Sequence, residues 1–102
     1  MQILYVGEDN LVQWLGMTSS VDGSYINDAT VAGVLKRQSG EIVADGITLA
    51  YVAGSNGDYR GEIDQSITLV HNARYTLELS AESQSREGFR RIECQAFYHE
   101  ER

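Results

Sequence analysis

The chain has 102 residues, of which 42% are hydrophobic and 23% are charged, and its formal net charge is −7. A chain of this length fits one independently folding domain and leaves no room for two ordinary ones. The acidic balance repels phosphate backbones, and the single cysteine excludes an internal disulfide framework.

The N-terminal residues carry no targeting or membrane signal. Met1–Leu4 lack the basic residues and the long apolar run of a secretory leader, and no apolar run elsewhere approaches membrane-spanning length. We therefore expect a chain made and kept in a reducing cytoplasm, with neither nucleic acid nor membrane as a partner.

The first half of the chain predicts short strands separated by turn-forming residues. Strand-like composition bounded by Gly, Asn, Asp and Ser is typical of small all-β domains. A polar stretch over Thr18–Asp28 predicts a long loop. The expected strands are Gln2–Val6, Leu11–Met17, Ala29–Arg37, Glu41–Ala44 and, after a break at Asp45-Gly46, Ile47–Val52.

The segment Leu11–Met17 differs from the other strands because both of its faces carry large apolar groups. Leu11, Gln13 and Leu15 share one face, whereas Val12 and Trp14 lie on the other. Such a segment is either fully buried or in contact with another chain.

The second half contains the strongest strand and turn signals. Asn56-Gly57 predicts a hairpin, and the residues from Tyr75 to Glu82 alternate strictly between apolar and polar. A crossover with one helical turn is expected over Asp64–Asn72, and a polar turn over Glu82–Gly88. The remaining expected strands are Asp58–Ile63 and Phe89–His99.

This pattern predicts an all-β fold, in which residues 1–102 form one Ig-like antiparallel β-sandwich of seven or eight strands. The chain contains no proline, a residue that often protects edge strands. Charged side chains such as Lys36, Arg60 and Glu78 must protect the edges instead, or another subunit covers them.

The residues that could support catalysis or bind a metal do not form a recognisable site. Cys94 shares a strand face with apolar neighbours and is expected in the core, and the spacing of His71 and His99 does not resemble a zinc site. Three loop carboxylates could converge on calcium, although solvated loop carboxylates are the more ordinary finding; they are Asp22, Asp28 and Asp58. We predict no catalytic residue, no metal and no cofactor.

The aromatic residues divide into expected core and expected interface. Tyr51, Tyr59 and Tyr75 are in register with apolar neighbours and are predicted to be core residues with hydroxyls at the rim. Trp14 and Tyr25 lie in less regular segments and are better candidates for an interface. The predicted interface residues are Leu11, Val12, Trp14, Leu15 and Tyr25, with residues 1–17 as a docking segment that could be removed without unfolding the domain.

Four stretches resemble a group of small tailed-phage and prophage proteins. They are Asp28–Val31, Ser39–Val43, Leu49–Gly61 and Ala73–Leu77, so the resemblance covers about residues 20–82. A similar order of turns and tyrosines recurs in transthyretin-like and carboxypeptidase-regulatory-like modules, which are Ig-like sandwiches. Asn72 stands where the phage proteins commonly have Gly before the strand.

The resemblance implies a structural bacteriophage protein without enzymatic activity: a capsid decoration, a head–tail connector (neck) subunit or a tail-attached subunit. Such a protein is made in the host cytoplasm, resides in the virion, and contacts other virion proteins as a homo-oligomer in multiple symmetric copies. Two alternatives remain. A carbohydrate-binding adhesion module would need coplanar exposed aromatics, and a small hydrolase would need a nucleophile–base pair that the sequence does not display.

Overall fold

The computed structural model describes residues 1–84 and 86–98, except the side chain of Arg86. These residues form seven strands and no helix, which confirms the all-β prediction. The described part of the chain therefore contains no helix long and apolar enough to cross a membrane. The strands are β1 (Gln2–Tyr5), β2 (Asn10–Trp14), β3 (Thr30–Arg37), β4 (Ile42–Tyr51), β5 (Tyr59–Ile63), β6 (Arg74–Ser83) and β7 (Arg86–Phe97).

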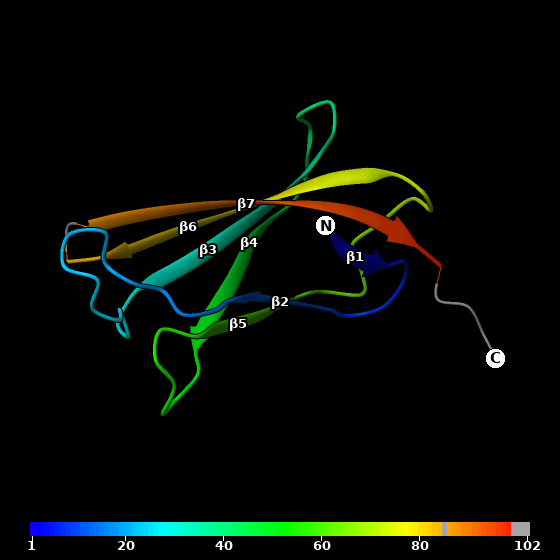
Figure 1. Cartoon of the computed structure of the whole chain (residues 1–102). Coiled ribbons are helices and arrows are strands. Elements are labelled where there is room, and N and C mark those ends of the chain that lie inside the picture. The colour runs from blue at the N-terminus through cyan, green and yellow to red at the C-terminus, as the bar shows by residue number, and fades with distance from the viewer. Residues whose placement is uncertain (85, 99–102) are drawn as a thin grey trace.

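The strands form one mixed sheet in the order β1-β7-β6-β3-β4-β5-β2 (Figure 1). Strand β4 is shared, because Ile42–Leu49 pair with β3 whereas Ala50 and Tyr51 pair with β5. The expectation of a purely antiparallel sheet is wrong, because β1 runs parallel to β7. Alternation along a strand indicates which side chains face inward but not the direction of the neighbouring strand.

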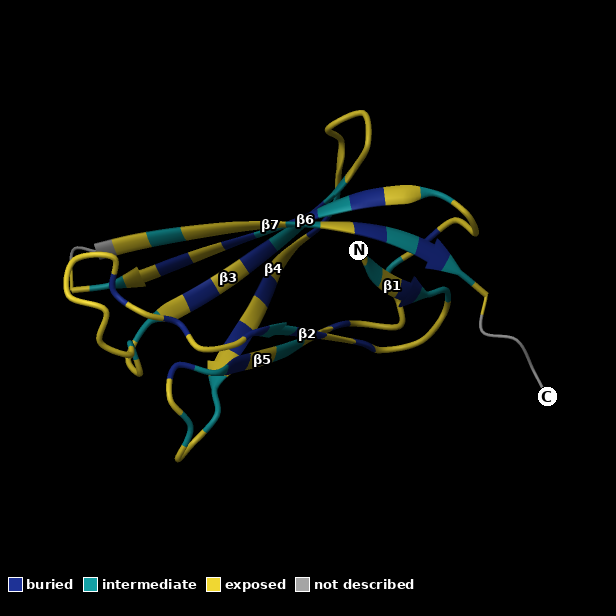
Figure 2. Ribbon diagram, in the orientation of Figure 1, coloured by how far each residue is buried: buried dark blue, intermediate teal, exposed yellow. Residues whose placement is uncertain are grey.

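The core lies on the concave side of the curled sheet. Strand β6 alternates as predicted, with Tyr75, Leu77 and Leu79 almost fully buried and the intervening side chains facing outward (Figure 2). Each large aliphatic side chain buried in this way contributes about 1.5–3 kcal/mol. Other fully buried side chains come from most of the remaining strands and include Leu4, Val12, Val31, Leu35, Tyr59 and Ile63.

Side chains join the two end strands of the sheet and nearly close it into a barrel. The Asn10 Oδ1 accepts a hydrogen bond from the Tyr5 N–H at 2.7 Å, and its Nδ2 donates to the carbonyls of Tyr5 and Glu8 at 3.0 and 3.1 Å. The Gln2 Nε2 donates to the Leu11 carbonyl at 2.8 Å. These contacts connect β1 to β2, which lie at opposite ends of the sheet order and are not paired as neighbouring strands.

Strand β4 continues through Asp45-Gly46, where the sequence predicts a break. The register with β3 shifts between Gly33 and Leu35, and Gly46 has a φ of +68°. A β-bulge therefore accommodates the two turn-forming residues inside one strand.

The expected turn over Glu82–Gly88 is much shorter in the structure. Glu82 pairs with Glu87 and Ser83 with Arg86, so the ladder continues almost to the hairpin tip, where Gln84 has a φ of +47°. The sequence predicted a loop here because polar residues are common both in loops and on the outward face of paired strands.

The crossover over Asp64–Asn72 contains turns instead of the expected helical turn. The Ser66 N–H donates to the Asp64 carboxylate, and the Ile67 N–H donates to the Asp64 carbonyl. At its end Asn72 has a φ of +70°, a left-handed conformation that Asn adopts more readily than most residues other than Gly. Asn72 therefore occupies a backbone position that would also suit Gly. The predicted end of the last strand at His99 lies outside the described residues.

Candidate interaction surface

The segment between β2 and β3 is fixed to the β4–β5 hairpin. The buried Tyr59 hydroxyl donates to the Ile26 carbonyl at 2.7 Å and accepts from the Ala29 N–H at 3.0 Å. The Met17 N–H donates to the Gly57 carbonyl, and a Cβ added at Gly57 would lie 2.5 Å from the Met17 carbonyl oxygen. The long loop predicted over Thr18–Asp28 is therefore held in a defined position at both ends.

The predicted interface residues divide between the two faces of β2. Leu11 and Leu15 point outward and are 48% and 54% exposed, whereas Val12 and Trp14 point inward and are buried. Tyr25 is 54% exposed and belongs to the separate loop, where it bridges to Thr18. The structure thus leaves Leu11, Leu15 and Tyr25 available to a partner and places Val12 and Trp14 in the core.

Residues 1–17 are an integral part of the sheet. They supply β1 and β2 together with the core side chains of Leu4, Val12, Trp14 and Met17. Removing them would expose much of the core, so the expectation that the domain stays folded without this segment is not consistent with the structure. Any docking role must be carried by outward side chains.

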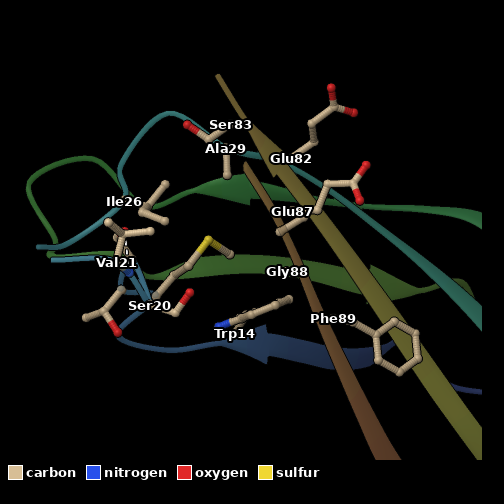
Figure 3. Close-up of a pocket in the computed structure, with 14 residues that line it drawn as sticks. Trp14, Ser20, Val21, Ile26, Ala29, Glu82, Ser83, Glu87, Gly88 and Phe89 are labelled. Carbon is tan, nitrogen blue, oxygen red and sulfur yellow. Dashed lines mark hydrogen bonds between the residues drawn. The ribbon is translucent and has the colours of Figure 1, made fainter. Parts of the chain in front are cut away.

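A hollow of about 330 Å³ lies between the loop and the β6–β7 hairpin (Figure 3). Trp14 and Ile26 contribute apolar surface, and the hollow also borders Glu82, Glu87 and Phe89. The Trp14 ring lies close to Gly88 of β7, since a Cβ added there would come within 3.3 Å of the indole.

The indole is also covered by a cation from β7. The Arg90 guanidinium carbon lies 4.7 Å from the Trp14 ring centroid, a cation–π distance. Arg90 shares the inward face of β7 with Ile92 and Cys94. The first and last thirds of the chain are therefore packed directly against each other.

The outward face of β3, β6 and β7 carries a small ion network. The Glu78 carboxylate lies 2.8 Å from the Lys36 Nζ and 3.2 Å from the Arg91 Nη2. The hydrogen bond from Lys36, reinforced by Arg91, lowers the pKa of the Glu78 carboxyl. Lys36, Glu78 and Arg60 lie on β3, β6 and β5, which have a neighbouring strand on each side, so the expectation that these residues protect edge strands is wrong.

The two described candidates for catalysis differ in burial. Cys94 is buried in the core, as predicted, and burial raises the pKa of its thiol to about 11. The exposed His71 stacks on Tyr98 with ring centroids 5.0 Å apart, and its Nδ1 accepts the Tyr98 N–H. A thiol with so high a pKa is mostly protonated at neutral pH and a poor nucleophile.

The three loop carboxylates that could converge on calcium are each engaged in local structure. Asp22 caps the turn at Ser24, Asp28 accepts from the Ser83 hydroxyl, and Asp58 accepts from the Gly16 N–H. Among the described residues no three His, Cys, Asp or Glu side chains are grouped so that they could hold a metal ion.

Two features of the structure were missed from the sequence. Phe89 was expected only as the first residue of a strand, yet its side chain is 59% exposed on the outward face of β7. Asn10, expected in a turn, is the buried polar side chain that joins the end strands. The apolar positions Ile92, Cys94 and Ala96 share one strand face, and extending this period back along the strand could have placed Phe89 on the other face.

Comparison of the chain with models of known protein families, with curated proteins and with solved structures found no match.

Proposed function

We propose that the chain is a structural, non-enzymatic subunit of a bacteriophage virion, a capsid decoration or a neck or tail-attached protein. It is made in the host cytoplasm and acts through contacts with other virion proteins in multiple symmetric copies. The class of protein comes from the resemblance of residues 20–82 to small phage proteins.

Within this proposal the chain adopts an Ig-like, transthyretin-like β-sandwich in which one pair of strands, β1 and β7, is parallel. The packing of Trp14 in β2 against Gly88 in β7 supports it, because strands near opposite ends of the sheet order face each other across the core. The sharing of β4 between two groups of strands also supports it.

The observation that carries the proposal is a pair of exposed leucines, Leu11 in β2 and Leu15 directly after it. Leu11 and Leu15 share the outward face of a segment whose strand residues all pair with β5. Single exposed apolar residues are ordinary on protein surfaces, but two on one strand face form the beginning of a contact patch. Because each leucine is already about half buried, its complete burial against a partner would contribute about 1 kcal/mol.

The test is incorporation of the chain into particles. In the strain that encodes the chain, a tagged copy is expected to co-sediment with induced phage particles at a fixed ratio to the major capsid protein. The double variant L11S/L15S is expected to fold normally by circular dichroism and to be lost from the particles.

The matched control is I42S/V70S, which removes two comparably exposed apolar side chains elsewhere. This variant is expected to be incorporated like the wild type. Particles that lack the tagged wild-type chain would overturn the virion assignment, and equal incorporation of both double variants would overturn the role of β2.

A further inference from the structure

Two thirds of strand β7 has no strand partner on one side. Strand β6 pairs with all of Arg86–Gln95, whereas β1 covers only Cys94–Phe97. In Figure 1 the N-terminal half of β7 continues well beyond β1. Among the described residues, Arg86–Glu93 therefore form an unpaired edge, which is a template for adding another strand.

The hydrogen-bond pattern shows which backbone groups face this edge. The Ala96 N–H and carbonyl both bond toward the β6 side, to Ala73 and Asn72, whereas the Phe97 carbonyl accepts from Val6 on the β1 side. The β6–β7 register continues without a shift to the hairpin, so these directions alternate along the strand. The N–H and carbonyl groups of Glu87, Phe89, Arg91 and Glu93 consequently point to the open edge.

We propose that this edge pairs with the same edge of a second copy of the chain, antiparallel and with Phe89 on the two-fold axis. In that register Phe89 opposes Phe89, and Glu87 of each copy opposes Arg91 of the other. The alternating backbone groups then meet as hydrogen-bonded pairs without any rearrangement of β7.

The charges along the edge favour a second copy of the chain as the partner, paired with Phe89 on the two-fold axis. Moving the axis to Arg90 would oppose Glu87 to Glu93, and moving it to Arg91 would oppose two arginines. Directly opposed like charges destabilise a sheet, whereas opposite charges and aromatic pairs stabilise it. An edge protected only by charge would repel its own copy, but the order Glu87, Phe89, Arg91 is complementary to itself.

The contact would also relieve an unfavourable pair within each copy. Glu82 and Glu87 are directly opposed on the outward face of the β6–β7 hairpin, and Glu87 makes no ion pair with the described residues. Arg91 of the second copy would lie on the other side of Glu87. Arg91 would then sit between its own Glu78, at 3.2 Å, and Glu87 of the second copy.

This inference goes beyond the proposed function, because the edge contact would form whether or not the chain belongs to a virion. Its test is the self-association of the purified full chain by analytical ultracentrifugation. The wild type is expected to reach a monomer–dimer equilibrium. E87R and R91E are each expected to weaken dimerisation by about tenfold or more, because the two-fold axis repeats each like-charge contact.

An equimolar mixture of E87R and R91E is expected to restore the dimer. In the mixed pair, arginines on one copy oppose glutamates on the other at both positions, so rescue also shows that both variants are folded. A wild type that stays monomeric up to its solubility limit overturns the proposal. Single variants that dimerise like the wild type, or a mixture that stays monomeric, overturn the assigned edge.

Cross-linking tests the register independently. In F89C/C94A the two new cysteines would form a hydrogen-bonded pair with Cα atoms about 5.5 Å apart, within disulfide range. Oxidation is expected to give a covalent dimer. R91C/C94A is the control, because Arg91 opposes Glu87 and not itself. A failure of F89C/C94A to cross-link, or equal cross-linking of the control, overturns the register.

Discussion

The Cys94 thiol couples folding to alkaline pH. Its side chain is 1% exposed, and burial raises its pKa from an ordinary value of 9.0 to about 11. The folded state therefore holds this proton more tightly than the unfolded chain does. Below about pH 9 the thiol is protonated in both states and does not change the free energy of unfolding. As the pH rises from about 9 to about 11, the thiol ionises first in the unfolded chain, so the free energy of unfolding falls.

Replacing Cys94 by Ala should remove this part of the pH dependence. Between about pH 8 and about pH 11 the wild type is expected to lose roughly 2–3 kcal/mol more stability than C94A. Urea unfolding at both pH values measures the difference. Burial also raises the pKa of Tyr59, but that contribution is common to both proteins and cancels. Equal losses in the two proteins would show that the thiol does not titrate in this range.

At the level of elements, Asn10 replaces a missing ladder between β1 and β2. Its side chain is 6% exposed and makes three hydrogen bonds to the backbone of Tyr5 and Glu8. In N10A those backbone groups lose their partners, so we expect a loss of roughly 1–3 kcal/mol in the free energy of unfolding. Hydrogen exchange should locate the effect, with faster exchange of the β1 amides.

The matched control for Asn10 is N56A, in the exposed turn before β5. A surface substitution of this kind is expected to change stability by less than about 0.5 kcal/mol. If N10A behaves like N56A, the end strands must be held together by the core alone.

The sequence predicts elements well where one local rule determines them. Alternation along Tyr75–Glu82 marked a half-buried strand, and Asn56-Gly57 marked a hairpin, where Gly57 has a φ of +73°. Pairing direction is different, because it depends on residues far apart in the chain. The parallel contact of β1 with β7 could not be obtained from the local pattern of either strand.

The candidate surface was predictable only in part, for a similar reason. Alternation places Leu11 and Leu15 on one face and Val12 and Trp14 on the other. Because both faces are apolar, the sequence does not show which of them points into the core. Only the packing of Trp14 against β7 decides between them. The open edge at Phe89 depends on where β1 ends along β7, which is also a long-range property.

At the scale of the whole molecule, Trp14 connects β2 to the opposite side of the fold. It contacts the Gly88 position and the Arg90 guanidinium, both in β7, and it borders the hollow beside the loop. In W14A the lost indole would leave a cavity in the core, so we expect a loss of about 3–5 kcal/mol in the free energy of unfolding. Urea denaturation and near-ultraviolet circular dichroism measure the loss of stability and of fixed aromatic packing.

Two further variants separate packing from charge at this contact. R90A removes only the cation above the indole and is expected to cost about 0.5–1 kcal/mol, while W14F keeps an aromatic ring and should fall between R90A and W14A. A loss for R90A as large as that for W14A would mean that the guanidinium, instead of the buried indole, holds β2 against β7. We expect the smallest loss of stability for R90A and the largest for W14A. In that case hydrophobic packing of the indole is the main connection between β2 and β7, and the Arg90 charge adds only a small contribution.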